Sequence, residues 1–343
     1  MAICKKRGDF QMKKVVILIL AAVMMLGILI PVSADDYAVK LSAPNGAPAL
    51  AVAALAVDDP DAYTFINADT IGAEFANKTS DFIIAPVNAG AKLYKAGKSD
   101  YKLAAVVTWG NLYFASQKAD FDLADINGSV ITLFGENSIN ASVVLYVLAQ
   151  KGLEPASVEY LAGAANTQSL LLTDENAIVV TAEPALTAAK MKNSAVTSYA
   201  VNDLYKEITG FDGYTQAGLF ISADMAANHA EAAADYLAKV KESVSKCSED
   251  LAAVAEAAAA LEILPNAKVA SAAIPNCALR YMSAPEAKEQ VEATANIDLS
   301  QFGGSVPADG FYYEAKYVLT NSRIYAGNYS DRLPDPGSRL DQK

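Results

Sequence analysis

The sequence contains few of the residues that usually catalyse reactions or bind metal ions. Its 343 residues include one histidine, His229, one tryptophan, Trp109, and three cysteines. With a single histidine there is no support for Ser/His/Asp chemistry or for a zinc cluster. An Asp-rich calcium loop and a glycine-rich nucleotide-binding motif are missing as well. The sequence therefore predicts a protein that is not an enzyme, holds no metal and uses no cofactor.

Positive charge is also scarce. There are 27 Lys and Arg residues against 39 Asp and Glu, a net charge of -12, which argues against nucleic acid and anionic membrane surfaces as partners. Hydrophobic residues make up 53% of the chain, enough for buried cores, and the length suits two domains of ordinary size. An anionic ligand stays open, because helix N-termini can outweigh a distant surface charge.

A long apolar run lies near the N-terminus. Lys13 and Lys14 precede the apolar residues 15–30, and the small residues of 31–34 end the run at Ala34. This arrangement is typical of a secretory signal peptide over residues 1–34 with cleavage near Ala34, and an uncleaved anchor helix is the alternative. We expect an exported, periplasmic or extracellular, soluble monomer, whether the natural start is Met1 or Met12.

Two cysteines, Cys247 and Cys277, remain after such a cleavage. In an oxidising compartment they either pair or stay buried thiols. Two cysteines in a chain of this length fall well short of a disulfide framework, so the sequence leaves the question open.

Short apolar strands, each followed by a Gly- or Pro-containing turn and a helical segment, occur in two sets. This alternation predicts an α/β protein with two mostly parallel sheets flanked by helices. The chain is predicted to cross between them near residues 112–117 and to return near residues 216–222. The first set covers residues 37–44, 81–86 and 102–109, and the second covers 129–134 and 177–184.

Four stretches resemble the solute-binding proteins of ABC importers, specifically the nitrate/sulfonate/taurine and thiamine-precursor type. The resemblance lies in the order and spacing of these stretches, and Asn127-Gly128-Ser129 departs from the Gly-Lys usual in the family. They are FDLADINGSVITLFGENSINASVVLYVLAQKGLEP (121–155), AIVVTAEPALTAAK (177–190), QAGLFISAD (216–224) and GGSVPADGFYYEAK (303–316).

The resemblance implies a type II periplasmic-binding architecture of two lobes joined by two hinge crossings. Lobe I is expected over residues 35–115 and 218–330, lobe II over residues 116–217, and a flexible tail over residues 331–343. The implied mechanism is hinge closure over a solute, followed by recognition of the closed form by an ABC permease in the membrane.

Candidate site residues in lobe I follow the predicted strands, because ligands of such sheets lie beyond the carboxyl ends of the strands. Each turn is either a ligand contact or a plain turn, and the Trp109 ring either covers a ligand or fills the core. The candidates are Ser42, Asn45, Gly46, Pro86, Asn88, Thr108, Trp109 and Asn111.

Candidates in lobe II occupy equivalent places. Glu136 and Glu183 either cap the helix that follows or select a ligand amine. Asn140 lies at the start of the same helix as Ser138. The candidates are Gly135, Glu136, Asn137, Ser138, Thr181 and Glu183.

Together these features predict an extracytoplasmic protein that captures a small polar organic or anionic solute in a cleft between its lobes and delivers it to an ABC importer. The solute stays open among sulfonates, taurine, nitrate and pyrimidine precursors. The alternatives are a ligand-sensing partner of a membrane receptor and, on the same scaffold, an enzyme.

Overall fold

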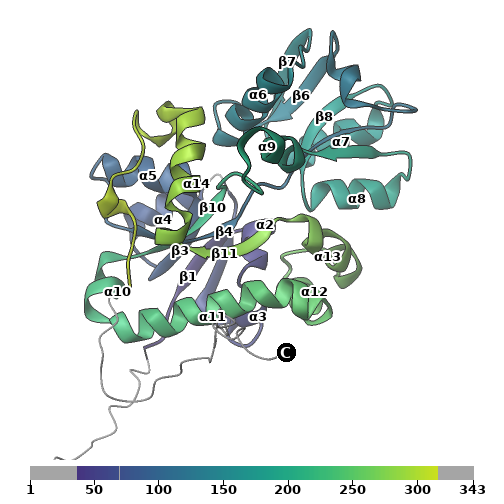
Figure 1. The fold of residues 1–343 in the computed structure, drawn as a ribbon. Coiled ribbons are helices and arrows are strands. Elements are labelled where there is room, and N and C mark those ends of the chain that lie inside the picture. The colour runs from purple at the N-terminus through teal and green to yellow at the C-terminus, as the bar shows by residue number, and fades with distance from the viewer. Residues whose placement is uncertain (1–36, 69, 316–343) are drawn as a thin grey trace, which may run out of the picture.

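The described residues form two mixed β-sheets, each flanked by helices. The computed structural model describes residues 37–68 and 70–315, so the expected signal peptide and the expected tail over residues 331–343 lie outside them. Figure 1 shows the elements of the second sheet gathered at one end of the molecule and those of the first sheet at the other. The predicted α/β fold is confirmed. No helix within the described ranges is long and apolar enough to cross a membrane.

The first sheet has six strands in the order β11-β4-β10-β3-β1-β2. Strands β1 to β4 run in one direction, whereas β10 and β11 run against them. β10 enters straight from the second sheet and lies between β3 and β4, antiparallel to both. The strands are β1 (Leu41–Pro44), β2 (Tyr63–Ile66), β3 (Phe82–Pro86), β4 (Lys102–Thr108), β10 (Ala217–Ile221) and β11 (Leu279–Ser283).

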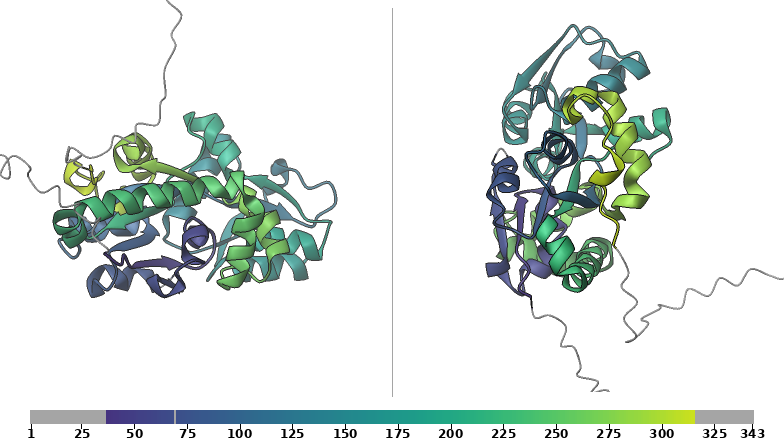
Figure 2. Two further views of the ribbon diagram at one scale, coloured as in Figure 1. Left: turned by 90° about the horizontal axis from the view of Figure 1, so that it is seen from below. Right: turned by 90° about the vertical axis from the view of Figure 1, so that its left-hand side faces the viewer.

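Helices cover both faces of the first sheet. One face packs through Phe220 against Phe75, and the other packs through Phe82 against Tyr236 of the long helix α11, which runs along one side of the molecule in Figures 1 and 2. The helices are α2 (Ala47–Leu50), α3 (Ala53–Ala56), α4 (Ile71–Asn77), α5 (Val87–Lys95), α10 (Ala223–Asn228), α11 (Ala230–Glu249), α12 (Leu251–Ala260), α13 (Ala267–Ala273) and α14 (Ala284–Ile297). The short 3-10 turns are η1 (Pro60–Ala62), η3 (Ile274–Asn276), η4 (Leu299–Phe302) and η5 (Asp309–Phe311).

The second sheet has five strands in the order β7-β6-β8-β5-β9, and only β5 runs against the other four. Helix α6 ends at Lys151 and is capped by Gly152, whose φ of 64° is the left-handed conformation that glycine adopts at little cost. The elements are β5 (Leu112–Ser116), η2 (Leu123–Ile126), β6 (Val130–Phe134), α6 (Ile139–Lys151), β7 (Ser157–Leu161), α7 (Ala164–Thr173), β8 (Ile178–Ala182), α8 (Ala185–Lys192), β9 (Thr197–Ala200) and α9 (Val201–Thr209).

The chain leaves the first sheet earlier than the sequence predicts. β4 ends at Thr108 and β5 already begins at Leu112, so residues 112–116, expected to contain the crossing, form a strand of the second sheet. Pairing with β8 and β9 on its two edges satisfies the backbone of β5, and Leu112 and Phe114 are buried. The return, residues 210–216 between α9 and β10, also lies earlier than the predicted residues 216–222, most of which form β10.

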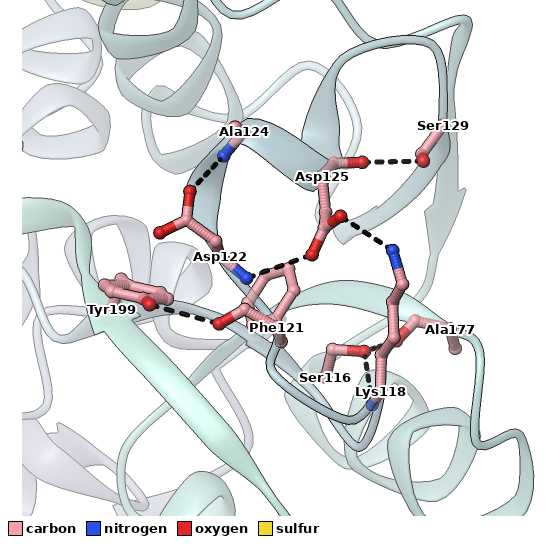
Figure 3. Close-up of polar contacts among 9 residues, drawn as sticks. All are labelled: Ser116, Lys118, Phe121, Asp122, Ala124, Asp125, Ser129, Ala177 and Tyr199. Atoms are coloured by element: carbon pink, nitrogen blue, oxygen red, sulfur yellow. Dashed lines mark hydrogen bonds and ion pairs between the residues drawn. The ribbon is translucent and has the colours of Figure 1, made fainter.

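The polar segment that joins β5 to β6 is fixed by local hydrogen bonds (Figure 3). Asp122 and Asp125 form a reciprocal capping box around η2, and Lys118 Nζ lies 2.7 Å from Asp125 Oδ1. Ser129 Oγ donates to the Asp125 carbonyl at 2.6 Å, and the Tyr199 hydroxyl donates to the Phe121 carbonyl at 3.1 Å. These bonds hold the start of β6 in place.

Candidate functional site

Five uncharged amide side chains meet where the chain passes between the sheets. We call them the carboxamide network. Four of them lie in or beside a turn that follows a strand or helix, and the fifth directly precedes β10. They come from the elements of both sheets. They are Asn88 in the first turn of α5, Asn111 between β4 and β5, Asn140 in the first turn of α6, Gln216 just before β10, and Gln301 in η4.

One half of the network runs through Gln216. Its Nε2 donates to Asn111 Oδ1 at 2.9 Å and lies 3.4 Å from Asn140 Oδ1. Asn111 Nδ2 donates to the Glu183 carbonyl at 2.8 Å, while the Glu183 N–H donates to the Asn111 carbonyl at 3.0 Å. The Tyr214 hydroxyl donates to Asn140 Oδ1 at 2.9 Å. This half therefore ties the strand ends of β4 and β8 and helix α6 to the start of β10.

The other half runs through Gln301. Its Nε2 donates to the Asn137 carbonyl at 2.9 Å, and its Oε1 accepts from Asn88 Nδ2 at 3.5 Å. Beside it, Ser142 Oγ donates to Asp298 Oδ2 at 2.8 Å. Hydrogen bonds from Ser300 and Ser142 hold the pKa of Asp298 below its ordinary value. The segment after α14 is thus bonded to the strand ends of both sheets.

The crossing itself is tightly packed. The Trp109 ring is 2% exposed, its Nε1 donates to the Arg280 carbonyl at 2.8 Å, and the Arg280 guanidinium lies 4.1 Å from the ring centroid. Asn202 Nδ2 donates to the Trp109 and Gly110 carbonyls, both at 2.8 Å. Gly110 has a φ of 80°, and a Cβ there would lie 2.3 Å from the Tyr214 ring. A side chain at position 110 of the crossing would therefore clash with the Tyr214 ring.

Three carboxamide oxygens around this crossing are buried with no hydrogen-bond partner among the described residues. They are Asn88 Oδ1, Asn202 Oδ1 and Gln216 Oε1. A buried acceptor without a partner costs free energy, so each of these oxygens is a candidate contact for a ligand donor.

Only some of the sequence-predicted site residues meet in the network. Asn88 and Asn111 contribute side chains, Asn137 and Glu183 contribute backbone carbonyls, and Thr108 Oγ1 accepts from the Ala217 N–H beside Gln216. The Trp109 ring fills the core at the crossing.

The remaining candidates lie elsewhere or make other bonds. Ser42 Oγ is bonded to Ser80 at 2.8 Å, away from the strand end, and Thr181 Oγ1 donates to the Ala164 carbonyl. Ser138 caps its own helix by accepting from the Ala141 N–H. Asn45, Glu136 and the Asn137 side chain are exposed, and Gly46, Pro86 and Gly135 are half-buried residues with no polar side-chain atom to offer.

The Glu183 carboxylate points to its own helix. Both of its oxygens accept from Thr187, one from the N–H at 3.1 Å and one from the hydroxyl at 2.9 Å. The side chain is 4% exposed, and burial raises the pKa of Glu183 above its ordinary value even though the Thr187 bonds lower it. Of the two roles that the sequence leaves open for Glu183, capping the following helix and selecting a ligand amine, this geometry corresponds to capping.

Sequence reasoning missed Gln216, Gln301, Tyr214 and Asn202 as site residues. Gln216 could have been predicted from the sequence, because it directly precedes β10, the strand with which the chain re-enters the first sheet. The role of Gln301 depends on how the segment after α14 packs, which no local pattern reveals.

Other chemistry in the described part of the chain is sparse. Cys247 and Cys277 are buried and unpaired, and burial raises the pKa of both thiols. No group of three or more His, Cys, Asp or Glu residues within the described ranges could hold a metal ion. A pocket of about 280 Å³, whose lining includes no residue of the network, lies between α5 and residues 302–311, where Lys95 Nζ donates to Ser305 Oγ at 2.7 Å.

Known proteins resemble this chain in structure. No protein-family model matches it, and no curated protein matches it either. An ABC transporter from Parabacteroides distasonis superposes with a TM-score of 0.68 at 22% identity, over 81% of this chain and 99% of that one. The periplasmic aliphatic sulphonate binding protein SsuA from Escherichia coli superposes with a TM-score of 0.64 at 14% identity, over 88% of this chain and 97% of that one.

The chain has the fold of ABC-transporter solute-binding proteins. The same fold also occurs in an enzyme, DSZB, whose complex with biphenyl-2-sulfinic acid superposes with a TM-score of 0.54 at 12% identity, over 80% of this chain and 95% of that one. Most of the structural neighbours are binding proteins. Because identity is low in each case, the likeness concerns the fold, and the function rests on the site.

Proposed function

We propose that this protein is the extracytoplasmic solute-binding component of an ABC importer. It captures a small polar organic solute at the carboxamide network, closes its two lobes about the crossings at residues 109–111 and 210–216, and delivers the solute to a membrane permease. Lobe I would comprise the first sheet with its helices, and lobe II the second. Export by the sequence-predicted signal peptide is part of this proposal.

The carboxamide network carries the proposal. Its side chains and carbonyls come from strand ends of both sheets, at the edge where α/β sheets bind ligands. Carboxamides are uncharged and offer both donors and acceptors, which suits a polar organic molecule. Motion about the crossings would make and break these bonds, so solute binding and lobe closure are coupled.

A binding screen tests this proposal. Thermal shift with purified protein, across amides, amines, heterocycles, carboxylates, sulfonates and nitrate, should reveal compounds that raise the melting temperature. A ligand at a hundred times its Kd adds about 2.7 kcal/mol of stability. Absence of any stabilising compound, in this panel and in fractionated metabolite extracts, would contradict the proposal.

Uptake separates the importer from the two alternatives. Cells that lack this protein should lose uptake of the labelled solute, and restoring the gene should restore it. A receptor-linked sensor would bind the solute without changing uptake, and an enzyme would convert it during incubation. Fold alone does not decide among these, because one scaffold hosts binders and enzymes.

A further inference from the structure

The orientation of the side-chain amides in the carboxamide network bears on the kind of solute that it accepts. Resting on the proposed function, we propose that the solute carries several N–H donors, as amides, ureas and amino-substituted heterocycles do, and that no oxyanion group faces the network. Each carboxamide can be oriented with its oxygen or its nitrogen toward a given neighbour, and hydrogen bonds to backbone carbonyls fix that orientation.

The orientation of Gln216 follows from the Glu183 carbonyl. A carbonyl only accepts, so the Asn111 atom that faces it at 2.8 Å must be Nδ2. Asn111 therefore turns Oδ1 toward Gln216, and the Gln216 atom that faces this oxygen at 2.9 Å must be Nε2. Gln216 Oε1 then points away from these bonds, and it is buried without a partner among the described residues.

Asn88 is oriented in the same way. The Asn137 carbonyl requires Nε2 of Gln301 at 2.9 Å, so Gln301 presents Oε1 to Asn88. The Asn88 atom that donates to this oxygen must be Nδ2. Asn88 Oδ1 is then buried and without a partner among the described residues. Asn88 and Gln216 are neighbours, because the N–H of Val87 donates to the Gln216 carbonyl at 3.0 Å.

Asn202 repeats the pattern at the crossing. Its Nδ2 donates to the carbonyls of Trp109 and Gly110, so its Oδ1 faces the other way and is also buried without a partner in the described part of the chain. Three separate chains of carbonyl-fixed amides thus end in acceptors. Rotating any one of them by 180° would place two acceptors face to face.

Such a set of acceptors selects for donors. Each buried acceptor left unpaired costs free energy, so closing the lobes is favoured by a solute that brings N–H groups to these oxygens. Nitrate and sulfonate head groups offer only acceptors and would face like partial charges. At the crossing, Arg280 Nε is also buried without a partner among the described residues. Its guanidinium lies over Trp109 and 3.5 Å from Asp212, whose carboxylate offsets its charge, and it makes no bond to the network.

Matched probes test the inference. Calorimetry with purified protein would compare benzamide with benzenesulfonate, ethylurea with propionate, and cytosine and adenine with nitrate. We expect the N–H-rich member to bind at least tenfold more tightly wherever either member binds. Tighter binding of the oxyanion members would overturn the inference while leaving a solute-binding protein. No binding by either kind would instead contradict the proposed function.

Variants of Asn88 test the mechanism with the tightest N–H-rich probe. Asn88→Leu removes the unpartnered oxygen in a side chain of similar size, so affinity should fall about tenfold or more. Asn88→Asp keeps an oxygen there and should lose less affinity than Asn88→Leu. Asn77→Leu changes an exposed carboxamide on α4 and should leave affinity unchanged.

Wild-type affinity in Asn88→Leu, with circular dichroism showing a folded protein, would overturn the assignment. If Asn88→Leu fails to fold, the comparison between Asn88→Asp and wild type decides. The carboxylate that Asn88→Asp introduces still accepts hydrogen bonds and adds negative charge, so a larger loss of affinity for the oxyanion probes than for the N–H-rich probes would support the inference. Equal loss of all probes would contradict it.

Discussion

The strand ends of the two sheets build the network in different ways. After β3 and β4, the first sheet turns the side chains of Asn88 and Asn111 inward. After β6 and β8, the second sheet offers mainly backbone carbonyls, those of Asn137 and Glu183, and their side chains point to solvent or to the following helix. Turns that follow strands therefore supply side-chain contacts from the first sheet and mainly backbone contacts from the second.

This difference predicts where substitutions matter. A side-chain contact is lost when the residue changes, whereas a backbone carbonyl survives most substitutions of its own residue. The first sheet should be the sensitive partner. Three paired experiments test this contrast, and they are given in order of decreasing expected effect.

The largest contrast should come from the glycines after β4 and β6. In Gly110→Ala, a φ of 80° and a Cβ placed 2.3 Å from the buried Tyr214 ring combine strain with overpacking, and we expect a loss of about 3 kcal/mol. In Gly135→Ala, φ is 68° and the closest atom, Ser138 Oγ, is 3.1 Å away, so the loss should be about 1 kcal/mol. Urea unfolding of both variants measures this, and equal losses would contradict the contrast.

The asparagines of the network should give the next contrast. Asn111→Ala removes the bond to the buried Glu183 carbonyl and leaves Gln216 Nε2 only its 3.4 Å contact with Asn140 Oδ1, which should cost about 2 kcal/mol. Asn137→Gly keeps the carbonyl that Gln301 uses and suits the φ of 59°, so stability should change by less than about 0.5 kcal/mol. Chemical denaturation compares them. A larger loss in Asn137→Gly would show that its side chain matters more than its carbonyl.

The smallest contrast is in pH dependence. Burial raises the pKa of Glu183, so the folded state binds its proton more tightly than the unfolded chain, and stability should fall as pH rises above the ordinary Glu pKa of 4.5 toward the raised value. Hydrogen bonds lower the pKa of Asp298, so its contribution is present above the ordinary Asp pKa of 3.8 and is lost as pH falls. The two carboxyls act in opposite directions.

Urea midpoints between about pH 3 and pH 7 check these signs. Glu183→Gln should remove a decline in stability with rising pH, and Asp298→Asn should remove a decline with falling pH. A wild-type-like profile in either variant would show that the other carboxyls of the chain set the pH dependence.

Local signals predict much of the fold and little of the network. Helix α6 begins after Ser138 and ends before Gly152, and a side-chain cap and a left-handed glycine are local signals that mark its two ends. The buried strands β3, β4 and β8 are readable as apolar runs ending in turns. The sequence does not mark β5 as a strand, since both of its pairing partners, β8 and β9, lie far along the chain.

The carboxamide network could not be predicted from the sequence, because its bonds depend on tertiary packing. The sequence places Asn88 and Asn111 at strand ends, where polar residues are expected. It does not say that Gln301, in a short turn after α14, reaches the strand ends of both sheets. Nor does it distinguish the inward Asn111 from the exposed Asn45, because both follow strands and differ only in tertiary packing.

The connectivity of the two sheets has a consequence for how the protein emerges during synthesis. All five strands of the second sheet come from one uninterrupted stretch, residues 112–200, whereas the first sheet needs β10 and β11 from beyond that stretch. The ribosome therefore releases a complete second sheet while the first still lacks its central strand β10. Contacts between residues that are close in sequence form more quickly, so the backbone amides of the second sheet should become protected from hydrogen exchange first. The bonds of Gln301 to Asn137 and Asn88 should form last.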